Sequence, residues 1–372
     1  MSETRVTKAR AARDLAGRVQ RFLFHDLVGV EVLADHPEDA AFFRDEYRDH
    51  AVARLPDDLR KVSIHYRRRS GFSPPPPGFT PHTHKFIARW SYRLALSEDR
   101  IAIEAAGNRS AVAMVHHMLL HPSLRYLASL EGALMLHAGS VACGGASLIF
   151  TGHGGAGKTT TTSVLLAADG AAWQPHADDY VFLRRGPQSL AYITRSHLYK
   201  DLLRWVPELE TRLTPGERLR LAAFGSLRAW SNENIKLPVR LPFDRLWPGR
   251  ETERQAVPAA LVVLARGDAG RAGLRRLEGA ELPLDALIEM NFGEARHFLR
   301  LVEKSSALED FNGWHSGWRA RERGLLSELL SEIPVYALQL PRRLAQPDEL
   351  YRALSEHLFD LLPREAQPDV AA

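Results

Sequence analysis

The sequence has very little cysteine: Cys143 is the only one in 372 residues. A single thiol cannot build an internal disulfide framework, and such scarcity suits a reducing compartment. The chain also has no apolar run of membrane-spanning length, and its first twenty residues lack the apolar stretch of a signal peptide. We therefore expect a cytoplasmic protein with no membrane partner.

An excess of one charge is missing as well. Lysine and arginine number 49 against 45 aspartates and glutamates, which leaves a net charge of +4. Because basic and acidic residues are nearly equal in number, the composition does not indicate a nucleic-acid partner. The apolar content of 45% is ordinary for a globular protein, and this length can hold two domains.

The most informative segment is residues 152–160, which read GHGGAGKTT and fit the phosphate-binding pattern G-x-x-x-x-G-K-[ST]. We expect a short buried strand before it, over residues 146–151, and a helix after it, over residues 160–168. This order places the N-terminus of a helix behind a bound phosphate. The alternative is a glycine-rich turn that binds no ligand.

The pattern predicts a nucleoside triphosphate and Mg²⁺ as ligands, since Lys158 can reach the outer phosphates and Thr159 offers a hydroxyl to the metal. The residues predicted to bind the nucleotide are Gly152, Gly154, Gly155, Ala156, Gly157, Lys158, Thr159 and Thr160.

Two adjacent carboxylates, Asp178 and Asp179, follow Lys158 by twenty residues and precede an apolar segment that we expect to form a strand. One carboxylate can share Mg²⁺ with Thr159 while the other accepts a hydroxyl proton. A turn or a helix cap is the structural alternative, because aspartate is common in both. His137 ends another apolar run, where a lone histidine is usually a satisfied core or surface group.

Apolar segments at residues 146–151, 180–183, 260–264 and 335–338 read as strands separated by helical stretches, which favours an α/β core. We expect three parts in the chain. They are a smaller α+β N-terminal module over residues 1–110, a nucleotide-binding core with helical insertions over residues 111–345, and a C-terminal helix and tail over residues 346–372.

Within the N-terminal module, residues 22–33 look like a strand and residues 38–47 like a helix. Residues 85–95 and 100–105 resemble two paired strands. A helical run over residues 112–121 is expected to stop at Pro122, because proline interrupts a helix.

The segment His137-Ala138-Gly139-Ser140-Val141, the GHGGAGKTT loop and the Asp178-Asp179 pair together resemble the catalytic core of HPr kinase/phosphorylase and its peptide-tailoring relatives. The resemblance covers residues 134–184 and extends more loosely to residues 333–338. It implies a phosphoenolpyruvate-carboxykinase-like P-loop core and an ATP- and Mg²⁺-dependent kinase. The implied acceptor is a hydroxyl, of the serine type, on a peptide, a protein or a small metabolite, and a homo-oligomer is compatible with it.

Carried over by position, the resemblance implies that Asp178 is the base and that Asp179 lies nearer the metal, with His137 beside the pair. The sequence also departs from the family. Gly154-Gly155 stands where a serine–glycine pair is usual, and no downstream E-x-R-G-x-G segment is found. These departures indicate a diverged member and not a true HPr kinase.

Two other functions stay open. A nucleotide-binding regulatory protein that hydrolyses ATP slowly or not at all needs only one metal carboxylate. Carboxykinase-type chemistry is the other, although the sequence shows no second histidine and lysine constellation for its metal site.

Four further residues have two interpretations each. Lys236 can reach a phosphate and Arg266 can supply charge at the transferred phosphoryl group, or both can be plain loop residues. His117 and His121 have a zinc-compatible i, i+4 spacing, but the H-E-x-x-H pattern is not completed.

Overall fold

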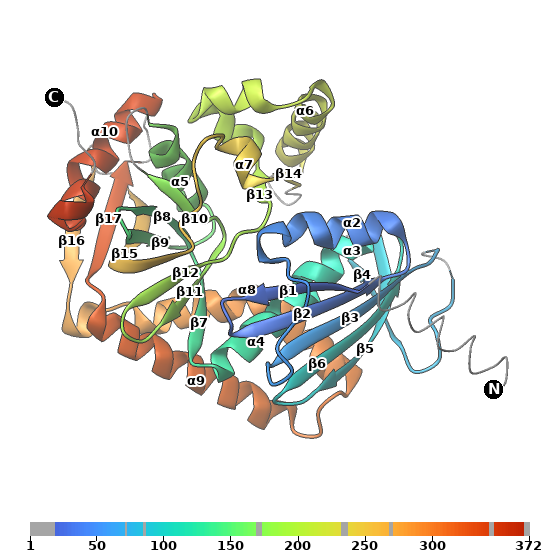
Figure 1. The fold of residues 1–372 in the computed structure, drawn as a ribbon. Helices are drawn as coiled ribbons and strands as arrows, with labels where there is room; N and C mark the ends of the chain where they lie inside the picture. The colour runs from blue at the N-terminus through green and yellow to red at the C-terminus, as the bar shows by residue number, and fades with distance from the viewer. Residues whose placement is uncertain are drawn as a thin grey trace. The chain divides into compact units, whose positions relative to one another are not determined.

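The structure is a computed structural model that describes residues 19–70, 73–84, 87–168, 173–231, 237–267, 271–341 and 346–367. It is a mixed α/β fold with two mixed sheets, as expected from the sequence (Figure 1). The chain divides into two compact units. Unit 1 contains residues 1–133 and 292–322, and unit 2 contains residues 134–291 and 323–372.

Unit 1 is built on a six-stranded sheet with the order β1-β2-β3-β6-β5-β4, in which β3 runs parallel to β2 and β6. Its strands are β1 (Gln20–Phe24), β2 (Val28–Ala34), β3 (Lys61–Arg68), β4 (Thr80–His84), β5 (Ala88–Leu96) and β6 (Arg100–Gly107). Its helices are α2 (Pro37–Glu46), α3 (Ala111–Val115), α4 (His121–Leu130), the part of α8 (Leu284–Ser305) from Phe292 and the part of α9 (Phe311–Glu332) up to Glu322.

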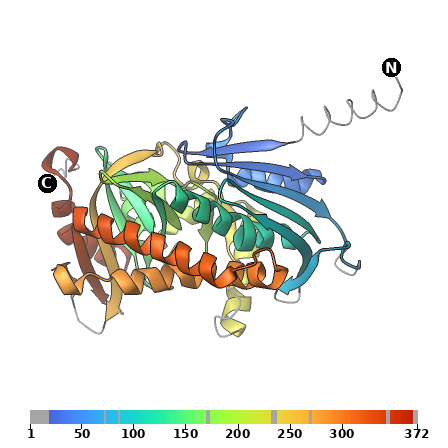
Figure 2. The same cartoon turned by 90° about the horizontal axis from the view of Figure 1, so that it is seen from below.

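Helices cover one face of this sheet. Helix α4 packs on β2 and β3, and α2 packs on β2, as Figures 1 and 2 show. Tyr92 of β5 donates its hydroxyl to the carbonyl of Leu301 in α8 at 2.8 Å. A strand near the beginning of the chain and a helix near its end thus belong to one core, which explains why unit 1 does not follow the expected bounds of 1–110.

The expected strand over residues 22–33 is a hairpin of β1 and β2, because His25 and Asp26 take φ angles of 52° and 56° and reverse the chain. Histidine and aspartate tolerate this left-handed region better than most residues. The expected stop at Pro122 was wrong. Proline occupies the first turn of α4, where its missing N–H costs little, and a π-helical turn (His116–Leu120) joins α4 to α3.

Unit 2 contains a nine-stranded mixed sheet and a two-stranded one. The large sheet comprises β7 (Ala133–His137), β8 (Gly139–Cys143), β9 (Ala146–Thr151), β10 (Gln174–Ala177), β11 (Tyr180–Arg184), β12 (Gln188–Ala191), β15 (Gln255–Gly267), β16 (Gly273–Leu277) and β17 (Val335–Pro341). The small one pairs β13 (Ser196–Leu198) with β14 (Val239–Leu241).

The helices of unit 2 include α5 (Lys158–Ala167), α6 (Pro215–Trp230), α7 (Phe243–Leu246), α10 (Pro347–Leu358) and the short 3₁₀ helices η3 (Lys200–Arg204) and η4 (Pro207–Arg212). The long strand β15 is parallel to β9 on one side and to β17 on the other. Helix α5 packs on β8 and β9, with α10 against it. Parallel strands present their carboxyl ends at one edge, and that edge carries the candidate site.

No helix among the described residues is both long and apolar enough to cross a membrane.

Candidate functional site

The glycine loop, residues 152–157, connects the buried strand β9 to helix α5. The expected strand, loop and helix are therefore present, and α5 begins two residues earlier than expected, at Lys158. The tip of the loop, at His153, Gly154 and Gly155, is exposed to solvent. The first turn of α5 carries N–H groups that have no partner within the helix, and these make its N-terminus favourable for an anion.

Two glycines let the loop backbone pass close to the end of β15. Gly152 has a φ of 147°, and a Cβ there would lie 2.7 Å from the carbonyl oxygen of Leu264. Gly157 has a φ of 105°, and a Cβ there would lie 3.2 Å from a guanidinium nitrogen of Arg266. Any side chain would be strained at both positions. The contact also places Arg266 against the loop.

Lys158 is buried and lies across the loop. Its Nζ donates to the carbonyl oxygen of Gly152 at 2.9 Å. This bond satisfies the ammonium group, which would otherwise carry a large desolvation cost. A phosphate oxygen bound in the loop would be a stronger, charge-assisted partner for the same group.

The aspartate pair forms the turn between β10 and β11. Asp178 is only 6% exposed, and its Oδ2 accepts from the Ser196 hydroxyl at 2.6 Å and from the His197 backbone N–H at 3.3 Å. Oδ2 of Asp179 lies 2.6 Å from Nδ1 of His197. Two consecutive residues of β13 thus hold both carboxylates: Ser196 and the His197 backbone hold Asp178, and the His197 side chain holds Asp179.

The two carboxyl groups differ in acidity. Burial, together with the neighbouring charge of Asp179, raises the pKa of Asp178 to about 6. Burial also acts to raise the pKa of Asp179, but the His197 imidazole and the positive charges of His137 and Lys158 outweigh it and lower that pKa below its usual value. One carboxyl can therefore take up a proton near neutral pH while the other stays ionised.

His137 ends β7 beside this turn. The next N–H, of Ala138, donates to the carbonyl oxygen of Asp179 at 3.0 Å, and the His137 ring lies 5.1 Å from the Tyr180 ring. The buried Asn291 of α8 fixes the strand end, because its side chain accepts from the His137 N–H at 3.0 Å and donates to the Met135 carbonyl at 3.1 Å. His137 is thus positioned next to the aspartates.

The oxygen ligands fit a magnesium ion. Oδ1 of Asp178 and of Asp179 accepts no hydrogen bond from a described residue, and Thr159 lies in the first turn of α5. Mg²⁺ needs few protein oxygens and takes its remaining ligands from water and phosphates. Across the described ranges, no group of three or more histidine, cysteine, aspartate or glutamate side chains is arranged to hold a metal, so the His117–His121 spacing acquires no further ligand.

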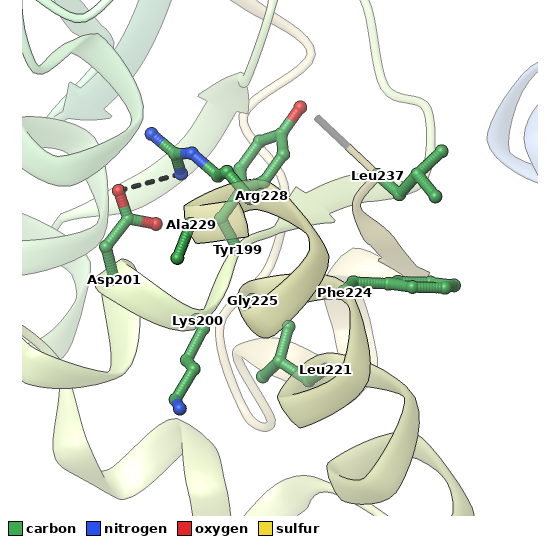
Figure 3. A pocket seen from close by; sticks show the side chains of 9 residues that line it. All are labelled: Tyr199, Lys200, Asp201, Leu221, Phe224, Gly225, Arg228, Ala229 and Leu237. Carbon is green, nitrogen blue, oxygen red and sulfur yellow. Dashed lines mark hydrogen bonds and ion pairs between the residues drawn. The ribbon is translucent and has the colours of Figure 1, made fainter. Parts of the chain in front are cut away.

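A cavity of about 380 Å³ lies between η3 and α6 (Figure 3). Tyr199, which follows β13 directly, is one of its lining residues. Burial raises the pKa of Tyr199 to about 12, and the charges of Asp179 and Asp178 add to that rise. Tyr199 therefore lines the cavity and also lies within electrostatic reach of the aspartate pair.

The structure brings together most of the residues singled out in the sequence. The glycine loop, Lys158, Asp178, Asp179 and His137 surround one edge of the unit 2 sheet, and Arg266 joins them. Lys236 lies outside the described residues.

Sequence reasoning missed Ser196, His197 and Asn291. The first two lie in a three-residue strand with no recognisable pattern, whereas Asn291 has a weak signal as a polar residue on the apolar face of a helix. The significance of this arrangement rests on its own chemistry: no protein-family model matches the sequence, and no curated protein matches it.

Proposed function

We propose that the protein is a kinase that transfers the γ-phosphoryl group of ATP to an alcohol, with Mg²⁺ as its metal. We also propose that unit 2 is a phosphoenolpyruvate-carboxykinase-like P-loop core of a diverged HPr kinase-like protein. The observation that carries the proposal is the proximity of the Asp178–Asp179 turn to the glycine loop, where the charge of Lys158 acts on Asp179.

The glycine loop binds the phosphates. Its backbone N–H groups and the N-terminus of α5 face the anion, and Lys158 exchanges its bond to Gly152 for one to an outer phosphate oxygen. Arg266, held against Gly157, adds positive charge near the phosphoryl group that is transferred.

Asp179 and Thr159 hold the metal, and the low pKa of Asp179 keeps this carboxylate ionised. When bound, Mg²⁺ neutralises charge on the β- and γ-phosphates and orients them for transfer. His197 fixes the Asp179 carboxylate through Nδ1.

Asp178 serves as the general base, since a pKa of about 6 lets it accept a proton at neutral pH. The acceptor O–H gives its proton to the Asp178 carboxylate while its oxygen forms a bond to the γ-phosphorus. The bond between that phosphorus and the β–γ bridging oxygen breaks, and ADP leaves with the electron pair. The products are a phosphomonoester, ADP and protonated Asp178.

The test is incubation with γ-labelled ATP, Mg²⁺ and a panel of hydroxyl-bearing metabolites and peptides, followed by mass spectrometry for the gain of one phosphoryl group. The Asp178→Asn variant should lose transfer by about a thousandfold or more, because proton acceptance is lost, and should still bind nucleotide. If Asp178→Asn transfers normally, the base is misassigned. ADP formation without any phosphorylated acceptor would favour a slowly hydrolysing regulatory protein.

A further inference from the structure

The cavity between η3 and α6 has the dimensions of a small-molecule site, about 380 Å³ (Figure 3). Helix α6 contributes Leu221, Phe224, Gly225 and Arg228 to its lining. These positions are spaced by three, one and three residues, so they share one face of the helix. One face of α6 therefore forms one side of the cavity, and η3 lies on the other side.

One wall of the cavity is apolar. Leu221 is buried and Phe224 and Leu237 are half-buried, and all three line it. Gly225 keeps the helix surface flat at the centre of this face. A Cβ at Gly225 would lie 2.6 Å from Cδ of Lys200, so the aliphatic carbons of Lys200 run directly over the glycine.

The cavity lining has two basic residues and one acidic residue. Arg228 pairs with Asp201 at 3.1 Å, and its guanidinium carbon lies 5.6 Å from the centre of the Tyr199 ring. Lys200 is exposed and has no ion pair or hydrogen bond with a described residue. The lining therefore carries one net positive charge next to the apolar wall.

The cavity also adjoins the candidate site along the chain. Ser196 and His197 of β13 hold the two aspartates, and Tyr199 and Lys200, which follow within three residues, line the cavity. The charges of Asp179 and Asp178 also act on Tyr199, so this lining residue lies within electrostatic reach of the aspartate pair.

We infer that this cavity binds an apolar anion, with the apolar part against Leu221, Phe224 and Leu237 and the anionic group at Lys200. We further identify this ligand as the phosphoryl acceptor, a step that rests on the proposed kinase function.

Equilibrium binding without nucleotide tests the cavity independently of any phosphoryl transfer. The probes are 8-anilinonaphthalene-1-sulfonate, an aromatic anion, and N-phenyl-1-naphthylamine, its uncharged analogue, followed by their fluorescence. We expect saturable binding of one sulfonate per chain, about fivefold or more tighter than the uncharged probe, as one charge contact would give. Equal affinity for both probes would overturn the assignment of an anion.

Matched variants locate the binding. Phe224→Ala should weaken both probes about tenfold through lost apolar contact, and Lys200→Gln should weaken only the sulfonate, about fivefold. Leu219→Ala and Arg220→Gln are the controls, because Leu219 is exposed and neither residue lines the cavity. They should leave both affinities unchanged.

Gly225→Leu guards against a variant that merely misfolds. Leucine favours the helix over glycine and fills the cavity, so the protein should remain folded by circular dichroism and lose both probes. Binding that survives Gly225→Leu and Phe224→Ala contradicts a site in this cavity.

The acceptor assignment has its own test. If the probes behave as expected and the sulfonate does not inhibit phosphorylation of an acceptor found with labelled ATP, the cavity binds an anion but the acceptor assignment is wrong. If the wild-type protein transfers no phosphoryl group to any acceptor while the probes bind as expected, the kinase function is contradicted and the anion site in the cavity is not.

Discussion

His197 contacts both aspartates, each through a different group. Its side chain contacts Asp179 and its backbone N–H contacts Asp178, while the adjacent Ser196 hydroxyl reaches Asp178 alone. The imidazole is also the strongest influence that lowers the pKa of Asp179. Substitutions at these two neighbouring residues can therefore test separately the metal binding that we propose for Asp179 and the proton acceptance that we propose for Asp178.

We predict that His197→Ala raises the Mg²⁺ concentration needed for half-maximal nucleotide binding by about tenfold, the usual effect of losing a group that orients a metal ligand. Ser196→Ala should leave that concentration unchanged and reduce the rate of phosphoryl transfer, because only Asp178 loses a partner. Titration of a fluorescent ATP analogue with Mg²⁺ measures the first effect. An identical Mg²⁺ requirement in both variants would contradict this division of roles.

At this scale the sequence located residues that belong to contiguous patterns. Lys158 and the glycines lie in one short motif, and Asp178 and Asp179 precede a strand. Ser196 and His197 could not be predicted, because their importance depends on a turn eighteen residues away that only tertiary packing brings to them.

At the scale of elements, helix α6 begins with a complete capping box. The Thr214 hydroxyl accepts from the Glu217 N–H, and the Glu217 carboxylate accepts from the Thr214 N–H at 2.9 Å. Arg245 of α7 adds two further hydrogen bonds to the same carboxylate, at 2.8 and 2.6 Å. Because α6 forms one side of the cavity, this carboxylate anchors the cavity wall.

The contribution of Glu217 to stability should depend on pH. Hydrogen bonds from Arg245 lower the pKa of Glu217 from 4.5 to about 2 in the folded state. A lowered folded-state pKa stabilises the protein above the unfolded-state value, and this stability is lost as the pH falls from about 4.5 towards 2. We expect Glu217→Gln to cost about 1–2 kcal/mol at neutral pH, since Arg245 is partly exposed.

Urea unfolding of the wild type and Glu217→Gln at several pH values checks this prediction. The difference between them should shrink steadily below pH 4.5. Glu210→Gln, at an exposed position of η4, should stay within about 0.5 kcal/mol of the wild type throughout. A difference that is constant from pH 7 to pH 3 would exclude this role for Glu217.

Elements with strong local patterns were predicted well. The helix expected over residues 38–47 is α2, and the strands expected over residues 180–183 and 335–338 are β11 and β17. Between the strands expected at residues 180–183 and 260–264 the sequence predicts helical stretches, but the structure also has β12 and β13 there, because short strands are fixed by pairing with distant partners and not by their own residues.

At the scale of the whole molecule, a buried ion pair closes unit 1 between its two chain segments. Arg125 of α4 is 2% exposed and Glu322 of α9 is 0% exposed, and Arg125 Nε donates to Glu322 Oε1 at 2.8 Å. Trp318 donates its indole N–H to the same oxygen at 2.8 Å, and the Arg125 guanidinium lies over the Phe292 ring. These contacts join residues almost two hundred positions apart.

Removing one member of this pair leaves a buried charge. Arg125→Met should therefore cost about 3–5 kcal/mol in unfolding free energy, because Glu322 loses its counter-charge. The double variant Arg125→Met/Glu322→Leu should recover most of this loss, since the charge is gone from the core. Chemical denaturation of the wild type, the single variant and the double variant measures these differences in unfolding free energy. A double variant no more stable than the single one would show that packing and not charge sets the cost.

The same long-range connection limits what the sequence could predict about the units. Residues 1–110 were expected to form a module by themselves, because composition and periodicity report on neighbouring residues. Unit 1 also includes α4 and the segment 292–322, whose contacts with the sheet leave no local signal.

Binding of an ATP analogue with and without metal tests the central claim most directly. Isothermal titration with β,γ-imido-ATP should give binding at least about tenfold tighter in Mg²⁺ than in EDTA, because the adjacent charges of Asp178 and Asp179 repel the phosphates until a cation lies between them. Equal affinity in both conditions, or no binding in either, would contradict the account.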